Sequence, residues 1–425
     1  MLYPLWIETC RRTPARPAVF DGATQATVTF QDLADGLALR PKTTAPVIAR
    51  GGSLSFFLDV LQAWRDGVPV VPLERDAPEP SLPAEIPAGT ALVKFSPGAA
   101  GIPRAVFFSA GALAADAARI VEAMDLLTSC TNVAAISLAH SYGFSNVVLP
   151  LLLHGVPVHA LPVPFPHILE EACAAHDTVI VPAVPSMWRA WHRAGVLGGI
   201  RIANAISAGA PLALDLEQGV FSSAGLKIHN FYGASECGGI SLDTRDTPRT
   251  NAGDVGTPLP GVSVSPHESG RLLVRSDSTA IAYDHYREGD ILGDGCYLTR
   301  DLGYLENDRI HITGHVGGSI NVAGRKISPW RVEQALLATG LASRVRVFGI
   351  PSHDPERVEE IAGIVDLAPG ATLPELKQAA LTQLAGWELP RHWRVQPEPS
   401  LWSLDLPALR RVFSTPDHSP QPPSK

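Results

Sequence analysis

Apolar segments of strand length alternate with apolar segments of helical spacing in the first part of the chain. Residues 17–39 predict two short strands joined by a turn and followed by a helix. Residues 47–50 predict a short strand, and SLSFFLDVLQAWRDG predicts a helix that ends at Gly67. The segment VPVVPL then predicts a buried strand. Because a strand, a helix and a strand joined by short links are typical of a parallel sheet, the pattern indicates an α/β fold.

The same alternation recurs in the next part of the chain. Further strands are predicted for VAAIS, VPVHAL, TVIVP and AISAG, at residues 133–137, 156–161, 178–182 and 205–209. Polar residues at 140–143 follow the first of them and precede an apolar helix. In an open α/β sheet, ligands collect at the carboxyl ends of the strands. We therefore expect a site where polar residues follow these strands.

After Gly253 the chain changes to short segments separated by Gly, Asp and Asn, which is typical of β-hairpins. From Ser328 onwards the pattern predicts a helix, two strands and a second helix. The expected fold class is therefore α/β, with a large N-terminal domain of parallel sheets flanked by helices, a β-hairpin-rich subdomain and a small α+β C-terminal domain. The expected boundaries are 1–316 for the large domain, 317–413 for the small domain and 414–425 for a disordered tail.

The composition limits the classes of function. A chain of 425 residues is expected to form two or more domains. A net charge of −8 without a Lys/Arg cluster argues against sequence-independent nucleic-acid binding. The five cysteines have no CxxC spacing, which argues against a zinc site or a disulfide framework. The N-terminus shows no signal peptide and the apolar runs are too short to span a bilayer, so we expect a cytoplasmic protein without a membrane span.

The segment HNFYGASECGG, at residues 229–239, combines residues that suit a nucleotide and a metal ion. Gly233 permits a sharp turn and the close approach of a ligand, and Tyr232 offers a flat ring for stacking on a heterocycle. Ser235 and Glu236 offer a hydroxyl and a carboxylate of the kind that Mg²⁺ prefers. The alternative is a strand end followed by a polar turn.

Six stretches resemble, in the same order, the adenylate-forming superfamily, which contains acyl-CoA synthetases, luciferases and the adenylation domains of peptide synthetases. The resemblance covers residues 14–413. The stretches are FSPGAAGIPR (95–104), LAHSYGF (138–144), SAGAPL (207–212), FYGASE (231–236), DVGTPLPGV (254–262) and YLTRDLGYLEND (297–308) with the following ITGHVGGSINVAGRKISPWRVEQAL (312–336).

The resemblance implies roles for individual residues. The first stretch corresponds to a phosphate loop whose backbone N–H groups cradle a triphosphate, although by itself it also fits a Pro-Gly turn before a helix that starts at FFSAGAL. The implied nucleotide-binding residues are Ser96, Gly98, Gly101, Arg104, Gly209, Ala210, Pro211, Asn230, Tyr232, Gly233, Ala234, Asp301 and His315. The implied catalytic residues are His140, Ser235 and Glu236, and Glu236 is also the implied metal ligand. The implied acyl-pocket residues are Tyr142, Gly143 and Phe144. The implied hinge of a mobile C-terminal domain is Gly317. For His140 the alternative is a histidine with satisfied hydrogen bonds at a strand end.

Several positions depart from the family pattern. Ala99 and Ala100 replace the loop hydroxyls, and Arg104 replaces a lysine. His315 replaces an arginine. The segment that aligns with the family's C-terminal catalytic lysine places Ser403 or a neighbour at that position. The LAHSYGF stretch lacks the aspartate that holds the substrate's amino group in peptide-synthetase domains. This absence favours a carboxylic acid without an amino group as the substrate.

The resemblance implies ATP-dependent activation of a non-amino carboxylic acid, of fatty or aryl type, as an acyl adenylate with Mg²⁺. The acyl group would then pass to the thiol of coenzyme A or to the phosphopantetheine arm of an acyl carrier protein. The departures leave an alternative open, a catalytically impaired relative that binds nucleotide or acyl ligand and acts as a subunit or regulator.

Overall fold

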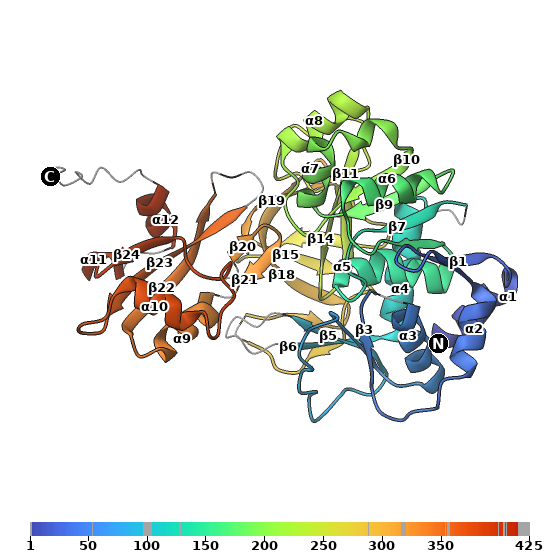
Figure 1. Ribbon diagram of the computed structural model, residues 1–425, viewed down its shortest axis with the longest axis horizontal. Coiled ribbons are helices and arrows are strands. Elements are labelled where there is room, and N and C mark those ends of the chain that lie inside the picture. The colour runs from blue at the N-terminus through green and yellow to red at the C-terminus, as the bar shows by residue number, and fades with distance from the viewer. Residues whose placement is uncertain are drawn as a thin grey trace. The chain divides into compact units, whose positions relative to one another are not determined.

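The computed structural model describes residues 2–52, 54–96, 104–126, 129–287, 289–315, 320–327, 329–352, 354, 358–397, 399–402, 404 and 406–414. The described residues fall into two compact units, the larger within residues 2–96 and 104–315 and the smaller within residues 320–414 (Figure 1). The expected α/β class is confirmed. The assignment of these spans to an AMP-binding domain and a mobile C-terminal domain stays a prediction. None of the described helices is long and apolar enough to cross a membrane.

The largest sheet of the first unit contains a run of parallel strands. In spatial order its strands are β13 (Thr257–Pro258), β12 (Gly238–Leu242), β11 (Ile228–Ala234), β10 (Ile202–Ser207), β9 (Val179–Ala183), β7 (Thr131–Ala134), β8 (Val158–Ala160), β1 (Pro17–Asp21) and β2 (Ala26–Thr29). The strands from β11 to β1 run parallel, and antiparallel pairings extend the sheet at both edges. The helical segments of this region are α4 (Ala110–Ala123), α5 (Ser141–Gly143), η1 (Phe144–Val148), η2 (Pro150–His154), α6 (Pro166–Ala174), α7 (Pro185–Arg193), η3 (Val196–Gly199) and α8 (Leu214–Ala224).

Both faces of this sheet are buried, which explains its uninterrupted apolar strands. Val179 and Val181 of β9 pack with Trp188 and Trp191 in one core cluster, whereas Ile180 packs into the other. Successive residues of a strand point to opposite faces, so a strand covered on both sides needs apolar residues at every position.

The second sheet contains the predicted strand–helix–strand unit. Its strands are, in spatial order, β16 (Ala282–Tyr283), β6 (Arg104–Ser109), β5 (Thr90–Ser96), β4 (Val70–Leu73) and β3 (Val47–Arg50). The helices that precede or connect its strands are α1 (Leu2–Arg12), α2 (Phe30–Ala38) and α3 (Leu54–Asp66). β3 and β4 are parallel and α3 connects them, as expected. The helix expected to start at FFSAGAL begins later, because Phe107 and Phe108 belong to β6 and Ser109 caps α4 by accepting from the Ala112 N–H.

Two helical segments differ from the sequence expectations. α1 is not predicted, although its buried Leu2, Trp6 and Cys10 are spaced four residues apart. The apolar helix after LAHSYGF is present, but η1 and η2 are π-helical, and the Leu149 N–H bonds to the Phe144 carbonyl five residues earlier. Such π-segments are rare and occur often near functional sites.

The segment after Gly253 forms β-hairpins, as expected. A third sheet contains β14 (Ser263–Pro266), β15 (Arg271–Arg275), β18 (Cys296–Glu306) and β17 (Leu292–Gly293), and β19 (Arg309–His315) pairs with β18. Their pairings are antiparallel.

The smaller unit is an α+β fold with its own core. Its elements are β20 (Ile320–Val322), β21 (Arg325–Ile327), α9 (Pro329–Ala338), β22 (Ala342–Pro351), β23 (Glu359–Leu367), α10 (Leu373–Ala380), β24 (His392–Val395), α11 (Pro399–Trp402) and α12 (Leu406–Ser414). Arg346 fixes the segment between α11 and α12 to the sheet, because its Nη1 donates to the carbonyl oxygens of Trp402 (3.4 Å) and Leu404 (2.8 Å). The Arg344 guanidinium stacks on the Trp402 ring at 4.0 Å.

Candidate functional site

The β11–β12 hairpin carries the HNFYGASECGG segment. β11 ends at Ala234, and residues 235–237 turn the chain into β12. Backbone pairing places Gly233 opposite Gly239. A Cβ atom at Gly233 would lie 2.7 Å from the Gly238 carbonyl oxygen, so the pairing admits only glycine there. The hairpin itself therefore requires the glycine that the sequence singled out for ligand approach.

Glu236 is held at this turn by contacts from a distant segment. Its backbone carbonyl accepts a hydrogen bond from the Ala280 N–H (2.8 Å), and its carboxylate accepts one from the Tyr283 hydroxyl (3.2 Å). The neighbouring Cys237 carbonyl accepts one from the Ser278 hydroxyl (2.8 Å). Glu236 remains partly exposed, so its carboxylate is accessible to a ligand.

Arg104 stacks on the ring of Tyr283. Its guanidinium carbon lies 3.3 Å from the centroid of the Tyr283 ring, and its Nη1 pairs with Asp290. Arg104 is only 3% exposed. The side chain that was expected to contact phosphate is therefore buried, and the contacts that the structure gives it stabilise the tyrosine that bonds to Glu236. Sequence reasoning missed Asp290 and Tyr283, since nothing local links them to Arg104.

Tyr232 and Asp301 meet although they belong to different stretches. The Tyr232 hydroxyl donates to Asp301 Oδ2 at 2.6 Å. Burial, reinforced by the Asp301 carboxylate, raises the pKa of Tyr232 well above its usual value, so the hydroxyl stays a donor. Asp301 lies on β18, where it faces His315 of β19. The structure thus places the expected adenine and ribose residues side by side.

The LAHSYGF stretch also lies against the turn. The Ser141 hydroxyl donates to the Ser235 hydroxyl at 3.1 Å. The Tyr142 hydroxyl donates to the Ile206 carbonyl at 3.3 Å, and its ring stacks on Phe231 with centroids 6.1 Å apart. His140 is exposed and precedes α5 as its N-cap residue. The expected acyl-pocket and nucleotide stretches are therefore adjacent.

Gly143 and Phe144 have packing roles. A Cβ atom at Gly143 would lie 2.0 Å from the Ser137 carbonyl oxygen, so a larger residue does not fit. Phe144 is fully buried and packs edge-on against Phe56, with centroids 6.4 Å apart. Their expected contact with an acyl group stays a prediction.

The Gly209-Ala210-Pro211 turn follows β10 and is partly exposed. Gly209 has φ +83°, a backbone conformation that favours glycine. Its position at the carboxyl end of a parallel strand is the one expected for an adenine-binding turn.

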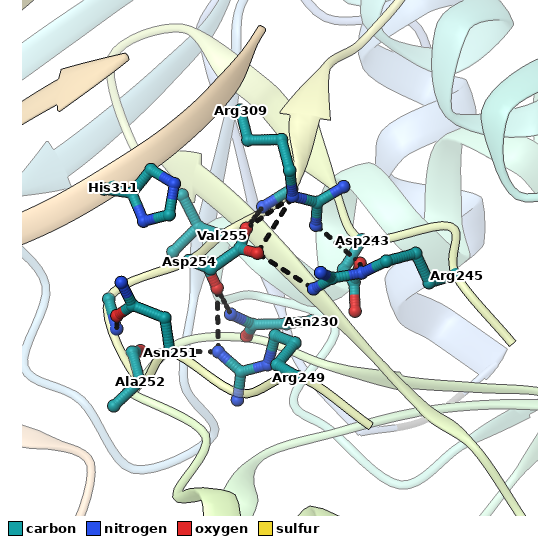
Figure 2. Close-up of polar contacts among 12 residues, drawn as sticks. Asn230, Asp243, Arg245, Arg249, Asn251, Ala252, Asp254, Val255, Arg309 and His311 are labelled. Carbon is teal, nitrogen blue, oxygen red and sulfur yellow. Dashed lines mark hydrogen bonds and ion pairs between the residues drawn. The ribbon is translucent and has the colours of Figure 1, made fainter. Parts of the chain in front are cut away.

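Asn230 belongs to a buried ionic network at the base of β11 (Figure 2). It is 4% exposed, and its Nδ2 donates to the Asp254 carbonyl at 3.2 Å. The Asp254 carboxylate pairs with Arg245 and Arg309, each at 2.9 Å. The structure therefore gives Asn230 a structural contact, and its expected reach towards adenine stays a prediction.

The network continues through four further buried residues. Lys227 donates to Glu217 (2.6 Å) and to Asp243 (2.9 Å), and Arg249 Nε donates to Glu217 (2.8 Å). Burial raises the pKa of Asp243, but hydrogen bonds from Arg245, Lys227 and Arg309 outweigh burial and lower the pKa to about 2. Each carboxylate of the network thus has at least two cationic partners.

Two charged residues beneath the turn were missed by sequence reasoning. Lys94 is 7% exposed, and burial lowers its pKa to about 8. Asp116 is 4% exposed, and its Oδ1 accepts from the Gly239 N–H at 2.9 Å. The available signal was a single charge inside an apolar segment, TALVKFS for Lys94 and AGALAADAARIVEA for Asp116.

The remaining predicted positions are not described. Gly98, Ala99, Ala100, Gly101, Gly317 and Ser403 lie outside the described residues, and the side chains of Ser96 and His315 are likewise not described. The described residues contain no group of three or more His, Cys, Asp or Glu side chains that could hold a metal ion.

The sequence matches the family described as AMP-binding enzyme over residues 53–283, more than half of the chain. A long-chain-fatty-acid–CoA ligase of Bacillus subtilis (strain 168) is 26% identical over 213 residues, a match that covers 46% of this chain and 38% of that protein. The matched segment is therefore well under two thirds of that relative's length.

Solved structures with the same fold cover nearly the whole chain. An o-succinylbenzoate CoA synthetase from Bacillus subtilis has a TM-score of 0.78 and 18% identity, covering 93% of this chain and 94% of that one. An amide bond synthetase from Marinactinospora thermotolerans has a TM-score of 0.80 and 19% identity, covering 97% and 99%. At these identities the likeness shows the fold.

Proposed function

Because the chain belongs to the AMP-binding enzyme family, we propose that it is an acid–thiol ligase that activates a non-amino carboxylic acid of fatty or aryl type. The observation that carries this proposal is the hydrogen bond between Ser141 and Ser235 (3.1 Å), which joins the stretch expected to bind the acid to the stretch expected to bind the nucleotide. An acyl adenylate needs both substrates at one place.

The nucleotide would lie between β11 and β18. The Tyr232 ring would stack on adenine, and the Asp301 carboxylate would accept hydrogen bonds from the ribose hydroxyls. The Tyr232–Asp301 hydrogen bond (2.6 Å) supports this arrangement, because it fixes the ring and the carboxylate relative to each other. The Gly209–Pro211 turn would cover the other side of the base.

Mg²⁺ fits the Glu236 carboxylate. Nucleotide-bound Mg²⁺ usually takes one or two protein carboxylates together with phosphate and water oxygens, so an all-protein cluster is not required. When bound, it would neutralise charge on the phosphates. The Tyr283 hydroxyl, supported by Arg104, would hold the carboxylate in place.

The reaction would proceed in two steps. A carboxylate oxygen of the acid attacks the α-phosphorus of ATP, the bond from that phosphorus to the bridging oxygen breaks, and pyrophosphate leaves. A thiolate sulfur then attacks the acyl carbonyl carbon, and the bond to the AMP oxygen breaks. His140 would lie near the acid carboxylate, with Tyr142 and Phe144 on the side of the acyl group. The thiol would come from coenzyme A or from the phosphopantetheine arm of a carrier protein, and a cytoplasmic location is part of the same proposal.

The B. subtilis relative is a ligase, which favours the active enzyme over the impaired relative. The alternative is supported by the combined departures at Ala99, Ala100, His315 and Ser403, of which the absent lysine at or near 403 is the largest. A fixed electrostatic donor in a transition state is commonly worth roughly 10²–10³ in rate. Ser403→Lys is therefore expected to raise adenylation if the wild type adenylates slowly.

The test is exchange of labelled pyrophosphate into ATP with a panel of fatty, aryl and short-chain acids. The proposal predicts exchange with at least one fatty or aryl acid, and a thioester by mass spectrometry when coenzyme A or a loaded carrier protein is added. ATP binding without exchange for any acid would reject the ligase and favour the nucleotide-binding relative.

A further inference from the structure

Lys94 on β5 is a buried ammonium without the partners that buried charges usually have. Among the residues that the structure describes, it has no hydrogen bond or ion pair. Its Nζ lies 4.9 Å from the centroid of the Phe108 ring and 5.8 Å from that of Phe144. A buried and incompletely paired charge lowers stability. Packing therefore does not explain a lysine at this position.

Two carboxylates act electrostatically on this ammonium, those of Asp116 and Glu236. Asp116 is packed directly beneath the turn, because its Oδ1 bonds to the Gly239 N–H and a Cβ atom at Gly238 would lie 2.3 Å from that oxygen. The turn therefore has two carboxyl groups, that of Asp116 below it and that of Glu236 on it, and burial raises the pKa of Asp116.

The neighbouring arginines are already paired. Arg104 pairs with Asp290, and Arg119 pairs with Asp277 and bonds to the Ser278 hydroxyl at 3.0 Å. The positive charge of Lys94, in contrast, is not engaged in an ion pair within the described residues.

We propose that Lys94 balances the charge of Asp116 and Glu236 so that the turn accepts an oxyanion, either a nucleotide phosphate or the carboxylate of the acid. The proposal rests on the function proposed above, which supplies both anions. Lys94 is the positively charged member of this group, and Lys94→Met removes that charge while both carboxyl groups remain. Loss of a positive charge next to an anion site is expected to weaken anion binding by roughly tenfold or more.

The experiment compares the affinities of AMP and adenosine, measured by calorimetry, for the wild type, Lys94→Met, Lys94→Arg and Lys42→Met. Lys42 is an exposed lysine and controls for net charge. We expect Lys94→Met to bind AMP at least tenfold more weakly and adenosine as the wild type does, while Lys94→Arg and Lys42→Met stay near the wild type for both ligands. A purely structural lysine would weaken both ligands equally.

The acid forms a second arm. At saturating ATP, the KM of the acid in pyrophosphate exchange is measured for the same variants. A tenfold rise in the KM of the acid for Lys94→Met, with unchanged AMP affinity, would show that Lys94 serves the carboxylate of the acid and not the nucleotide phosphate. Equal loss of AMP and adenosine, or no change in either arm, overturns the proposal. AMP binding needs no turnover, so an enzyme without exchange activity would reject the ligase while the role of Lys94 is still tested.

Discussion

Lys94 and Lys227 are both buried lysines of the larger unit, yet their surroundings differ. Lys227 donates to Glu217 at 2.6 Å, to Asp243 at 2.9 Å and to the Ile228 carbonyl at 2.8 Å. Lys94 faces two aromatic rings at 4.9 and 5.8 Å. The first ammonium has an acceptor for each of its three N–H groups, whereas the second has none among the described residues.

The two lysines lie near opposite ends of β11. Lys227 immediately precedes the strand and pairs with Asp243. Asp243 in turn pairs with Arg309, which also pairs with Asp254 (Figure 2). Glu236 follows the other end of the strand in the turn to β12, and Asp116 lies beneath this turn. A fully satisfied polar network rigidifies a structure. The paired charges fix one end of the strand, whereas at the other end Lys94 has no ion pair within the described residues, which is the basis of the proposal that a ligand anion uses its charge.

The largest expected effect is a loss of stability when Lys227, in the ionic network at the start of β11, is replaced. Lys227→Met leaves Glu217 and Asp243 buried with one cation fewer, and breaking a buried pair in this way costs about 3–5 kcal/mol. Lys94→Met removes an ammonium that makes no hydrogen bond or ion pair within the described residues, so it should lower the free energy of unfolding much less than Lys227→Met does. Urea denaturation of both variants checks the contrast. Equal destabilisation of the two would show that both lysines are structural.

Lowering the pH should reduce the stability that the ionic network around Asp243 contributes. The pKa of Asp243 is lowered from 3.8 to about 2 in the folded protein, so the unfolded chain binds a proton first as the pH falls. The associated stability, about 2 kcal/mol, is present above pH ~4 and lost as the pH approaches ~2. The measurement is the free energy of unfolding against pH. Asp243→Asn is the control, and a slope in this range identical to that of the wild type would contradict the assignment.

A smaller effect, on the rate of pyrophosphate exchange, is expected from removing the hydrogen bond that joins the LAHSYGF stretch to the HNFYGASECGG segment. Ser141→Ala removes the hydroxyl that donates to Ser235, and one such hydrogen bond contributes about 0.5–1.5 kcal/mol. We expect the loss mainly in kcat of pyrophosphate exchange, because the hydrogen bond sets the relative position of the two substrates. Ser223→Ala, which removes an exposed helix hydroxyl, is the matched control. If Ser141→Ala raised only the KM of ATP, the hydrogen bond would not join the two stretches in the way proposed.

Much of the architecture follows from local pattern. β3 matches the predicted residues 47–50, and α3 ends just before the predicted cap at Gly67, since each segment has one consistent period and a clear boundary. α1 was missed because its three buried apolar residues are spread over a short, polar segment. The π-helical η1 and η2 could not be predicted, because an apolar run gives no signal for the helix type.

The site could be predicted only in part. Glu236, Tyr232 and Asp301 follow from their stretches, but their partners come from elsewhere in the chain. Tyr283 bonds to Glu236 across 47 residues, and Arg104 pairs with Asp290 across 186. Such contacts are set by tertiary packing, which the sequence does not display residue by residue.

The central claim is that the turn after β11 binds a nucleotide with its metal ion. The most direct test is calorimetric titration of ATP in the presence and absence of Mg²⁺, with the wild type and Glu236→Gln. We predict that Mg²⁺ strengthens ATP binding to the wild type and that Glu236→Gln removes at least tenfold of that gain while leaving adenosine affinity unchanged. Equal Mg²⁺ dependence in both proteins would contradict the assignment of Glu236 and of the turn.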